Sequence, residues 1–186
     1  MTVLDVFLML IAVVLIFLIS MQGLLRSLIV ALAFYVVTFV VGAVALSYTS
    51  ITSALSALTA TIGLRWPQSL SYQAIVFLGL GMPMFIAIWF LTSLVLGDVD
   101  MTSVKVLDAL LAFLVGIVLA LVIASILCNV WGILVRTPWR DTQTWQRLYA
   151  AYKSSVFRPH LQTILAWYRR TLFFFHITRM PEFLIP

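Results

Sequence analysis

Residues 106–135 read VLDALLAFLVGIVLALVIASILCNVWGILV, an apolar run in which Asp108 is the only charged residue. As an α-helix rising about 1.5 Å per residue, this run is about 45 Å long. The hydrocarbon core of a bilayer is only about 30 Å thick. We therefore predict a transmembrane helix over residues 106–135 that tilts or extends beyond the bilayer.

Small residues occupy every fourth position of this helix, and we call them the small-residue ladder: Ala112, Gly116, Ala120, Ala124, Cys128 and Gly132. Helices in lipid are held together by close backbone approach and dispersion, which small residues permit. The ladder therefore predicts a helix-packing surface. The spacing leaves open whether the partner helix belongs to the same chain or to another subunit. Asn129, on the same helix, is expected to bond across to another helix.

Three further apolar runs cover residues 2–21, 28–48 and 72–96. The first has no basic n-region and no small-residue cleavage site, so it is expected to remain in the protein. The linker between the first two runs, residues 22–27, is so short that they should form an antiparallel hairpin. Together the four runs predict an all-α integral membrane protein with a four-span domain over residues 1–135.

The third span and the linker before it each allow two interpretations. Gly79, Gly81 and Pro83 should kink or locally unwind the third span. A broken span can mark a transporter's substrate site, but no charged side chain accompanies this one, which favours a structural kink. Residues 49–62 predict an amphipathic linker helix with an uncharged polar face. It either rests on the bundle, which we prefer, or senses loosely packed lipid.

Composition excludes an ordinary soluble domain. Of the 186 residues, 64% are hydrophobic and 9% are charged, against about 45–50% and about 25% in typical soluble domains. Cys128 is the one cysteine, so the chain can form neither an internal disulfide nor a thiolate metal cluster.

The positive charge is concentrated in residues 136–186, which hold eight basic and two acidic residues, a net +6, against −1 for residues 1–135. Helix signals at Thr137-Pro138 and Arg158-Pro159 predict two basic amphipathic helices here. Basic residues interleaved with aromatic ones favour a tail lying on anionic lipid, not one that binds nucleic acid. The residues expected to contact the membrane surface are Arg140, Trp145, Arg147, Lys153, Arg158, Trp167, Arg169 and Arg170.

The same charge predicts the orientation. Basic loops stay in the cytoplasm, so the tail should be cytoplasmic and four spans return the N-terminus to that side; an odd number of crossings is the alternative. Arg26 would then lie at the outer face with Asp98, Asp100 and Asp108. We expect Arg26 to pair with one of these carboxylates, unless each side chain reaches water separately.

The sequence predicts no catalytic, cofactor-binding or metal site of the chain's own. His160 and His176 lie in the tail without a carboxylate or cysteine at ligand spacing. The spans hold neither paired catalytic carboxylates nor an activated nucleophile. A structural lipid is a bound group compatible with this composition.

These patterns resemble the colicin V production protein family, small four-span proteins of the bacterial inner membrane. The resemblance covers roughly residues 3–135 and rests on Gly23-Leu24-Leu25-Arg26 after the first span, and on Lys105-Val106-Leu107 with Gly116 in the last. The chain departs from the family pattern at Gln22, Ser27, Asp108 and Ala112. The resemblance implies a multi-pass bacterial inner-membrane protein whose relatives have been linked to peptide export.

We therefore expect a non-enzymatic membrane subunit or scaffold, an accessory subunit of a larger, energy-transducing membrane complex. Its partners would be the lipid bilayer and other integral membrane subunits, and not nucleic acid. The alternative is a small export or channel component of the colicin V production type, with a pathway at the break in the third span. The lack of polar residues within the spans favours the subunit.

Overall fold

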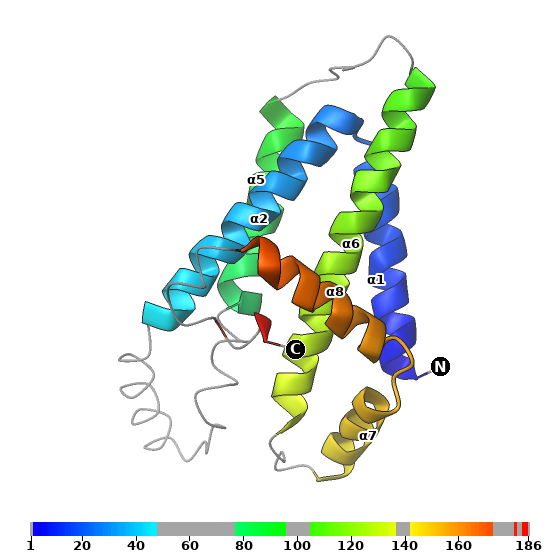
Figure 1. Cartoon of the computed structure of the whole chain (residues 1–186), viewed down its shortest axis with the longest axis vertical. Helices are drawn as coiled ribbons and strands as arrows, with labels where there is room; N and C mark the ends of the chain where they lie inside the picture. Colours follow the sequence, from blue (N-terminus) through cyan, green and yellow to red (C-terminus); the bar gives the residue numbers. More distant parts are fainter. Residues whose placement is uncertain are drawn as a thin grey trace.

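The computed structural model describes residues 2–47, 77–95, 105–136 and 142–172, with residues 181, 184 and 185. Its long elements are all helices (Figure 1): α1 Val3–Ser20, α2 Leu24–Ser47, the π-helical turn η1 Phe77–Gly81, α5 Met82–Val95, α6 Lys105–Arg136, α7 Thr142–Lys153 and α8 Arg158–Thr171. Four described segments are long and apolar enough to cross a membrane, namely Val3–Ser20, Leu24–Ala45, Phe77–Val95 and Lys105–Val135. The predicted all-helical architecture with four spans is confirmed at this level. The linker helix expected over residues 49–62 lies outside the described residues.

The second span begins four residues earlier than predicted. We expected a linker over residues 22–27, but α2 starts at Leu24. Gly23 adopts a positive φ of 78°, which completes the turn, and the Leu24 N–H donates to Asp108 Oδ2 at 3.1 Å. A carboxylate at the first turn of a helix satisfies a free N–H and complements the helix dipole. The boundary therefore depends on a residue 84 positions away, which a local pattern cannot contain.

The described part of the third span begins with the π-helical turn η1, which continues directly into α5. This turn contains Gly79 and Gly81 and ends two residues before Pro83, where the sequence predicts a break. A π-helical turn is a common way for a helix to accommodate such an irregularity. Residues 72–76 of the predicted span are not among the described residues.

Helix α6 occupies the centre of the bundle. It packs against α1, α2, α7 and α8, and α5 packs on α2. Helices α1 and α2 form the predicted antiparallel hairpin, but they diverge from their shared turn, one on each side of α6 (Figure 1). The hydrophobic core consequently has two clusters, one at α2, α5, α6 and α8 and the other at α1, α6, α7 and α8.

The tail helices belong to the bundle and do not form a separate surface layer. α8 starts at Arg158-Pro159, as the sequence predicts. We expected its apolar face to rest on lipid, but Leu165 and Leu172 are fully buried within the cluster that α6 and α2 build. An amphipathic pattern shows which face is apolar, and both lipid and protein can cover such a face. The helix start expected at Thr137-Pro138 lies outside the described residues.

Replacing Gly23 with alanine should lower the free energy of unfolding by about 1–2 kcal/mol, because a side chain is strained at positive φ. The new Cβ would also lie 2.9 Å from Asp108 Oδ2. Denaturant titration in mixed micelles measures this loss. The matched control is Gly79→Ala, since no atom lies within 4 Å of a Cβ at Gly79. Equal stability of the two variants would contradict the role assigned to Gly23.

Candidate functional site

The small-residue ladder faces α1 of the same chain. All six of its residues are buried. A Cβ built on Gly116 would lie 3.4 Å from the carbonyl oxygen of Ile16 and 3.5 Å from Ile19 side-chain atoms. Further along, Ala124 and Cys128 cluster with Leu4 and Leu8 of α1. The question left open by the spacing is thus answered by the structure, and the partner helix is α1.

The last rung of the ladder receives a tail residue. A Cβ on Gly132 would overlap the ring of Tyr152, which is buried on α7. The Arg158 guanidinium in turn lies 4.4 Å from the centre of the Tyr152 ring, within the range of a cation–π contact. The ladder on α6 therefore packs against α7 as well as α1, because Gly132 has no side chain and leaves room for the Tyr152 ring.

Asp5 joins the beginning of α1 to the turn between α7 and α8. Its side chain is fully buried. Oδ2 accepts the Thr2 N–H at 2.8 Å while the Asp5 N–H donates to Thr2 Oγ1 at 3.2 Å, which is a capping box. Oδ1 accepts the Ser155 hydroxyl at 2.5 Å. The Val156 and Phe157 N–H groups add longer contacts of 3.4 Å and 3.5 Å.

In this arrangement helix dipoles stabilise the negative charge of the Asp5 carboxylate. The N-termini of α1 and α8 both point their N–H groups toward it, so two helix dipoles stabilise one negative charge. The apolar pattern of the first span does not predict this role, because Asp5 is a lone acidic residue within the run 2–21. The Thr-x-x-Asp spacing from Thr2 could have revealed the capping box, but no local pattern points to Ser155.

Asp108 plays a corresponding part at the other end of the bundle. It is 4% exposed, and its Oδ2 caps α2 through Leu24. Arg26 follows Leu24 by two residues, so Arg26 and Asp108 lie at the same end, as predicted. The contact found for Asp108 is with backbone, and pairing of Arg26 with a carboxylate stays a prediction. Asp98 and Asp100 are not among the described residues.

Asn129 was expected to bond to another helix. Its Nδ2 donates to the carbonyl oxygen of Ile185 at 2.8 Å, so this amide holds Ile185 against α6, and a bond from Asn129 to another helix stays a prediction. Leu184, next to Ile185, is fully buried in the larger core cluster. Leu184 and Ile185 therefore pack against the bundle.

The tail residues predicted to contact the membrane surface differ in their exposure. Arg147, Lys153, Trp167 and Arg170 are exposed, whereas Arg158 and Arg169 are half-buried. Trp145 is half-buried, and its Nε1 donates to the carbonyl oxygen of Val135 at 2.9 Å, near the end of α6. It also stacks on Tyr149. Arg140 lies outside the described residues.

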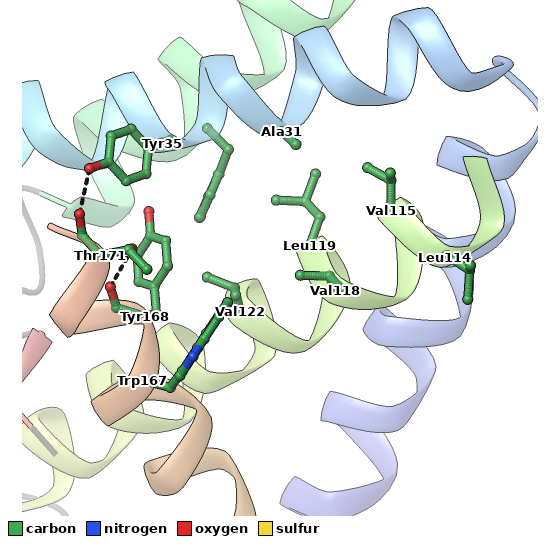
Figure 2. A pocket seen from close by; sticks show the side chains of 11 residues that line it. Ala31, Tyr35, Leu114, Val115, Val118, Leu119, Val122, Trp167, Tyr168 and Thr171 are labelled. Atoms are coloured by element: carbon green, nitrogen blue, oxygen red, sulfur yellow. Dashed lines mark hydrogen bonds between the residues drawn. The ribbon is translucent and has the colours of Figure 1, made fainter. Parts of the chain in front are cut away.

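An open apolar groove of about 450 Å³ lies where α2, α6 and the end of α8 meet (Figure 2). Its walls come from Ala31 and Phe34 of α2 and from aliphatic residues of α6 between Leu114 and Val122. Trp167, Tyr168 and Thr171 of α8 form one end. At that end the Tyr35 hydroxyl donates to the carbonyl oxygen of Thr171 at 2.8 Å, which fixes α8 to α2. No local sequence pattern predicts this groove, because three separate helices build it.

Tyr168 contributes its ring to the groove while its hydroxyl is buried. The neighbouring Thr38 hydroxyl donates to the Phe34 carbonyl oxygen, and the Tyr168 hydroxyl has no hydrogen-bond partner among the described residues. Burial raises the pKa of Tyr168 far above its ordinary value, and Thr38 offsets this only in part. Tyr168 is consequently neutral at any working pH.

Among the residues that the structure describes, no group of three or more His, Cys, Asp or Glu side chains could hold a metal ion. His160 is exposed on α8, and His176 lies outside the described residues. Comparison with known proteins finds no matching family model, no matching curated protein and no matching solved structure.

Replacing Gly116 with leucine should separate α1 from α6 and destabilise the fold by about 1–3 kcal/mol, the usual cost of overpacking a close contact. Thermal unfolding in detergent, followed by circular dichroism, measures the effect. Gly79→Leu is the control, because the space around Gly79 is open. If both variants melt at the wild-type temperature, the ladder is not a close contact.

Asp5→Asn and Ser155→Ala should each destabilise the attachment of the tail, and their effects should be coupled by about 0.5–3 kcal/mol, as for residues that share a hydrogen bond. The readout is a double-mutant cycle of unfolding free energies, with limited proteolysis of the α7–α8 turn. Ser154→Ala is the matched control, since Ser154 is exposed and donates only to Ala150. Strict additivity of Asp5→Asn and Ser155→Ala would show that their hydrogen bond contributes nothing.

Proposed function

We propose that this protein is a non-catalytic integral membrane subunit or scaffold, which serves as an accessory subunit of a larger membrane complex. The observation that carries the proposal is that the two buried carboxylates make structural hydrogen bonds at helix ends. Asp5 and Asp108 lie at opposite ends of the bundle, and both accept hydrogen bonds from backbone N–H groups at helix starts. Their described contacts hold helices in place, as expected of a structural part.

The surface of the bundle supports assembly with other membrane proteins. The third span, Phe77–Val95, is the least covered of the four, with 11% of its window buried against 50% for the fourth. Its exposed stripe on α5 consists of Ile86, Phe90 and Leu94 at intervals of four residues. We propose that this α5 stripe contacts the partner subunit, because a second helix can cover it without disturbing the core.

We include three more specific expectations in this proposal. They are a bacterial inner-membrane location with a cytoplasmic tail, an energy-transducing complex as the assembly, and a divergent relationship to the colicin V production family. The location rests on the positive charge of residues 136–186. The energy-transducing complex rests on the sequence predicting no catalytic, cofactor-binding or metal site of the chain's own. The family relationship rests on the Gly-x-x-Arg motif at Gly23–Arg26.

A small export or channel component is the second candidate. The observation that favours it is η1, because π-helical turns are frequent at functional sites. Transport would need polar groups along a path through the bundle, and the described residues of η1 and α5 carry no ionisable side chain.

Gentle detergent extraction followed by native mass analysis tests the proposal. The protein should migrate with larger integral membrane subunits, and alanine replacement of Ile86, Phe90 and Leu94 together should release it. The control is the same treatment of Leu10, Val14 and Phe17, an exposed stripe on α1. Solitary migration of the wild type, with peptide transport by reconstituted vesicles, would favour the exporter.

A further inference from the structure

Helix α1 fixes the depth at which the tail contacts the bundle. It has 18 residues, so it is about 27 Å long, no more than the roughly 30 Å of hydrocarbon that a membrane span must cross. Its first turn therefore lies close to one surface of the bilayer. Asp5 in that turn accepts the Ser155 hydroxyl, which places the connection between α7 and α8 at the same surface.

The end of α6 gives the same depth independently. Gly116 packs beside Ile16 of α1, and Gly132, sixteen positions after Gly116, lies about 24 Å farther along α6. Ile16 is thirteen positions, or about 20 Å, from the start of α1 at Val3. Because the two helices run antiparallel, Gly132 lies level with the start of α1 to within one helical turn.

Helix α7 is attached to α6 at this depth. The Trp145 Nε1 donates to the carbonyl oxygen of Val135 at 2.9 Å, and the Tyr152 ring occupies the space over Gly132. Figure 1 shows α7 at the same end of the bundle as the start of α1 and the end of α6. A tryptophan here has its favoured position, because the indole suits the boundary between hydrocarbon and water. We conclude that α7 lies at the bilayer surface.

The face of α7 that is turned away from the bundle is positive. Leu148 and Tyr152 pack in the core cluster with residues of α1 and α6, whereas Arg147 and Lys153 are exposed. Residues 142–171, which include both α7 and α8, contain no acidic residue. Each exposed lysine or arginine at a bilayer surface strengthens the attraction to anionic lipid.

The end of α8 lies at a different depth. The Tyr35 hydroxyl donates to the carbonyl oxygen of Thr171, and Tyr35 is close to the middle of α2, Leu24–Ser47. Arg170 is exposed like Arg147, but its backbone lies beside the middle of a span. Its depth separates it from the headgroups that α7 can contact.

We propose that α7 is an interfacial helix whose outward face binds the headgroups of anionic phospholipids, with Arg147 and Lys153 paired to their phosphates. The bonds of Trp145 and Ser155 to the ends of α6 and α1 hold the helix at that depth. Charge complementarity and depth together select the lipid, because an exposed cationic face at the bilayer surface lies among headgroups. This surface is separate from the α5 stripe and does not depend on the proposed subunit role.

A quenching experiment tests the depth of α7. Cys128 is replaced by alanine, a fluorophore is attached to Ala150→Cys on the exposed side of α7, and the full-length protein is reconstituted into bilayers. The lipids carry a nitroxide either on the headgroup or deep in an acyl chain. The headgroup nitroxide should quench the label more strongly. The order should reverse for Leu10→Cys, the matched control, which is 59% exposed near the middle of α1.

A lipid competition tests the charge. The protein is exchanged in mild detergent with equal amounts of phosphatidylglycerol and phosphatidylcholine, and retained lipid is counted by native mass spectrometry. Arg147→Gln and Lys153→Gln should each reduce the preference for phosphatidylglycerol about fivefold, and Arg147→Lys should preserve it because it keeps the charge. Arg170→Gln is the matched control, since it removes the same charge from an exposed position beside the middle of α2, and it should leave the preference unchanged.

Several outcomes would overturn the inference. Stronger quenching of Ala150→Cys by the acyl-chain nitroxide, or quenching by neither, would place α7 away from the headgroups. Equal losses in Arg147→Gln and Arg170→Gln would show that net charge alone retains the lipid. An acidic protein that copurifies and shields the label would replace the lipid as the partner of α7.

Circular dichroism establishes that each variant is folded, and the two separate cation variants guard against misfolding of one. None of these results bears on migration with a larger complex, so the two proposals fail independently.

Discussion

Inside a bilayer, burying apolar surface no longer drives helices together, so α1 stays against α6 only because small residues let their backbones approach closely. Gly116 provides this approach beside Ile16 and Ile19, and Ala124 and Cys128 cluster with residues nearer the N-terminus of α1. Once α1 is seated there, its N-terminus presents Asp5 to the α7–α8 turn. The turn after α1 also brings Leu24 to Asp108. Both ends of the bundle thus follow from one contact.

The two buried aspartates show how backbone N–H groups at helix starts can partner a carboxylate inside a helical bundle. Asp5 receives N–H groups from two helix starts, and Asp108 receives one from α2. Both oxygens of Asp5 accept hydrogen bonds, whereas Asp108 accepts one through Oδ2 and its buried Oδ1 has no hydrogen-bond partner among the described residues. These bonds reduce the cost of burying the carboxylates. Such groups are well suited to fixing helix ends, because a displaced helix would leave a charge and several donors unpaired.

The basic tail has two different surfaces. Its apolar face packs on α6 and α2 and carries Leu165 and Leu172, which are fully buried. Its basic side stays exposed at Arg147, Lys153 and Arg170. This combination places positive charge against the side of a membrane bundle, next to an apolar groove. The buried apolar face and the exposed basic side are thereby separated on one short segment.

The sequence by itself determined the four spans, the small-residue ladder and the start of α8 at Arg158-Pro159, because these depend on local composition, spacing and proline geometry. Tertiary structure alone decided that α1 fills the ladder, that α2 begins at Leu24 and that the apolar face of α8 meets protein. Periodicity identifies an apolar face but not its neighbour, since lipid and protein side chains are equally apolar. The bond from Ser155 to Asp5 spans 150 residues, so only the folded chain brings its two groups together.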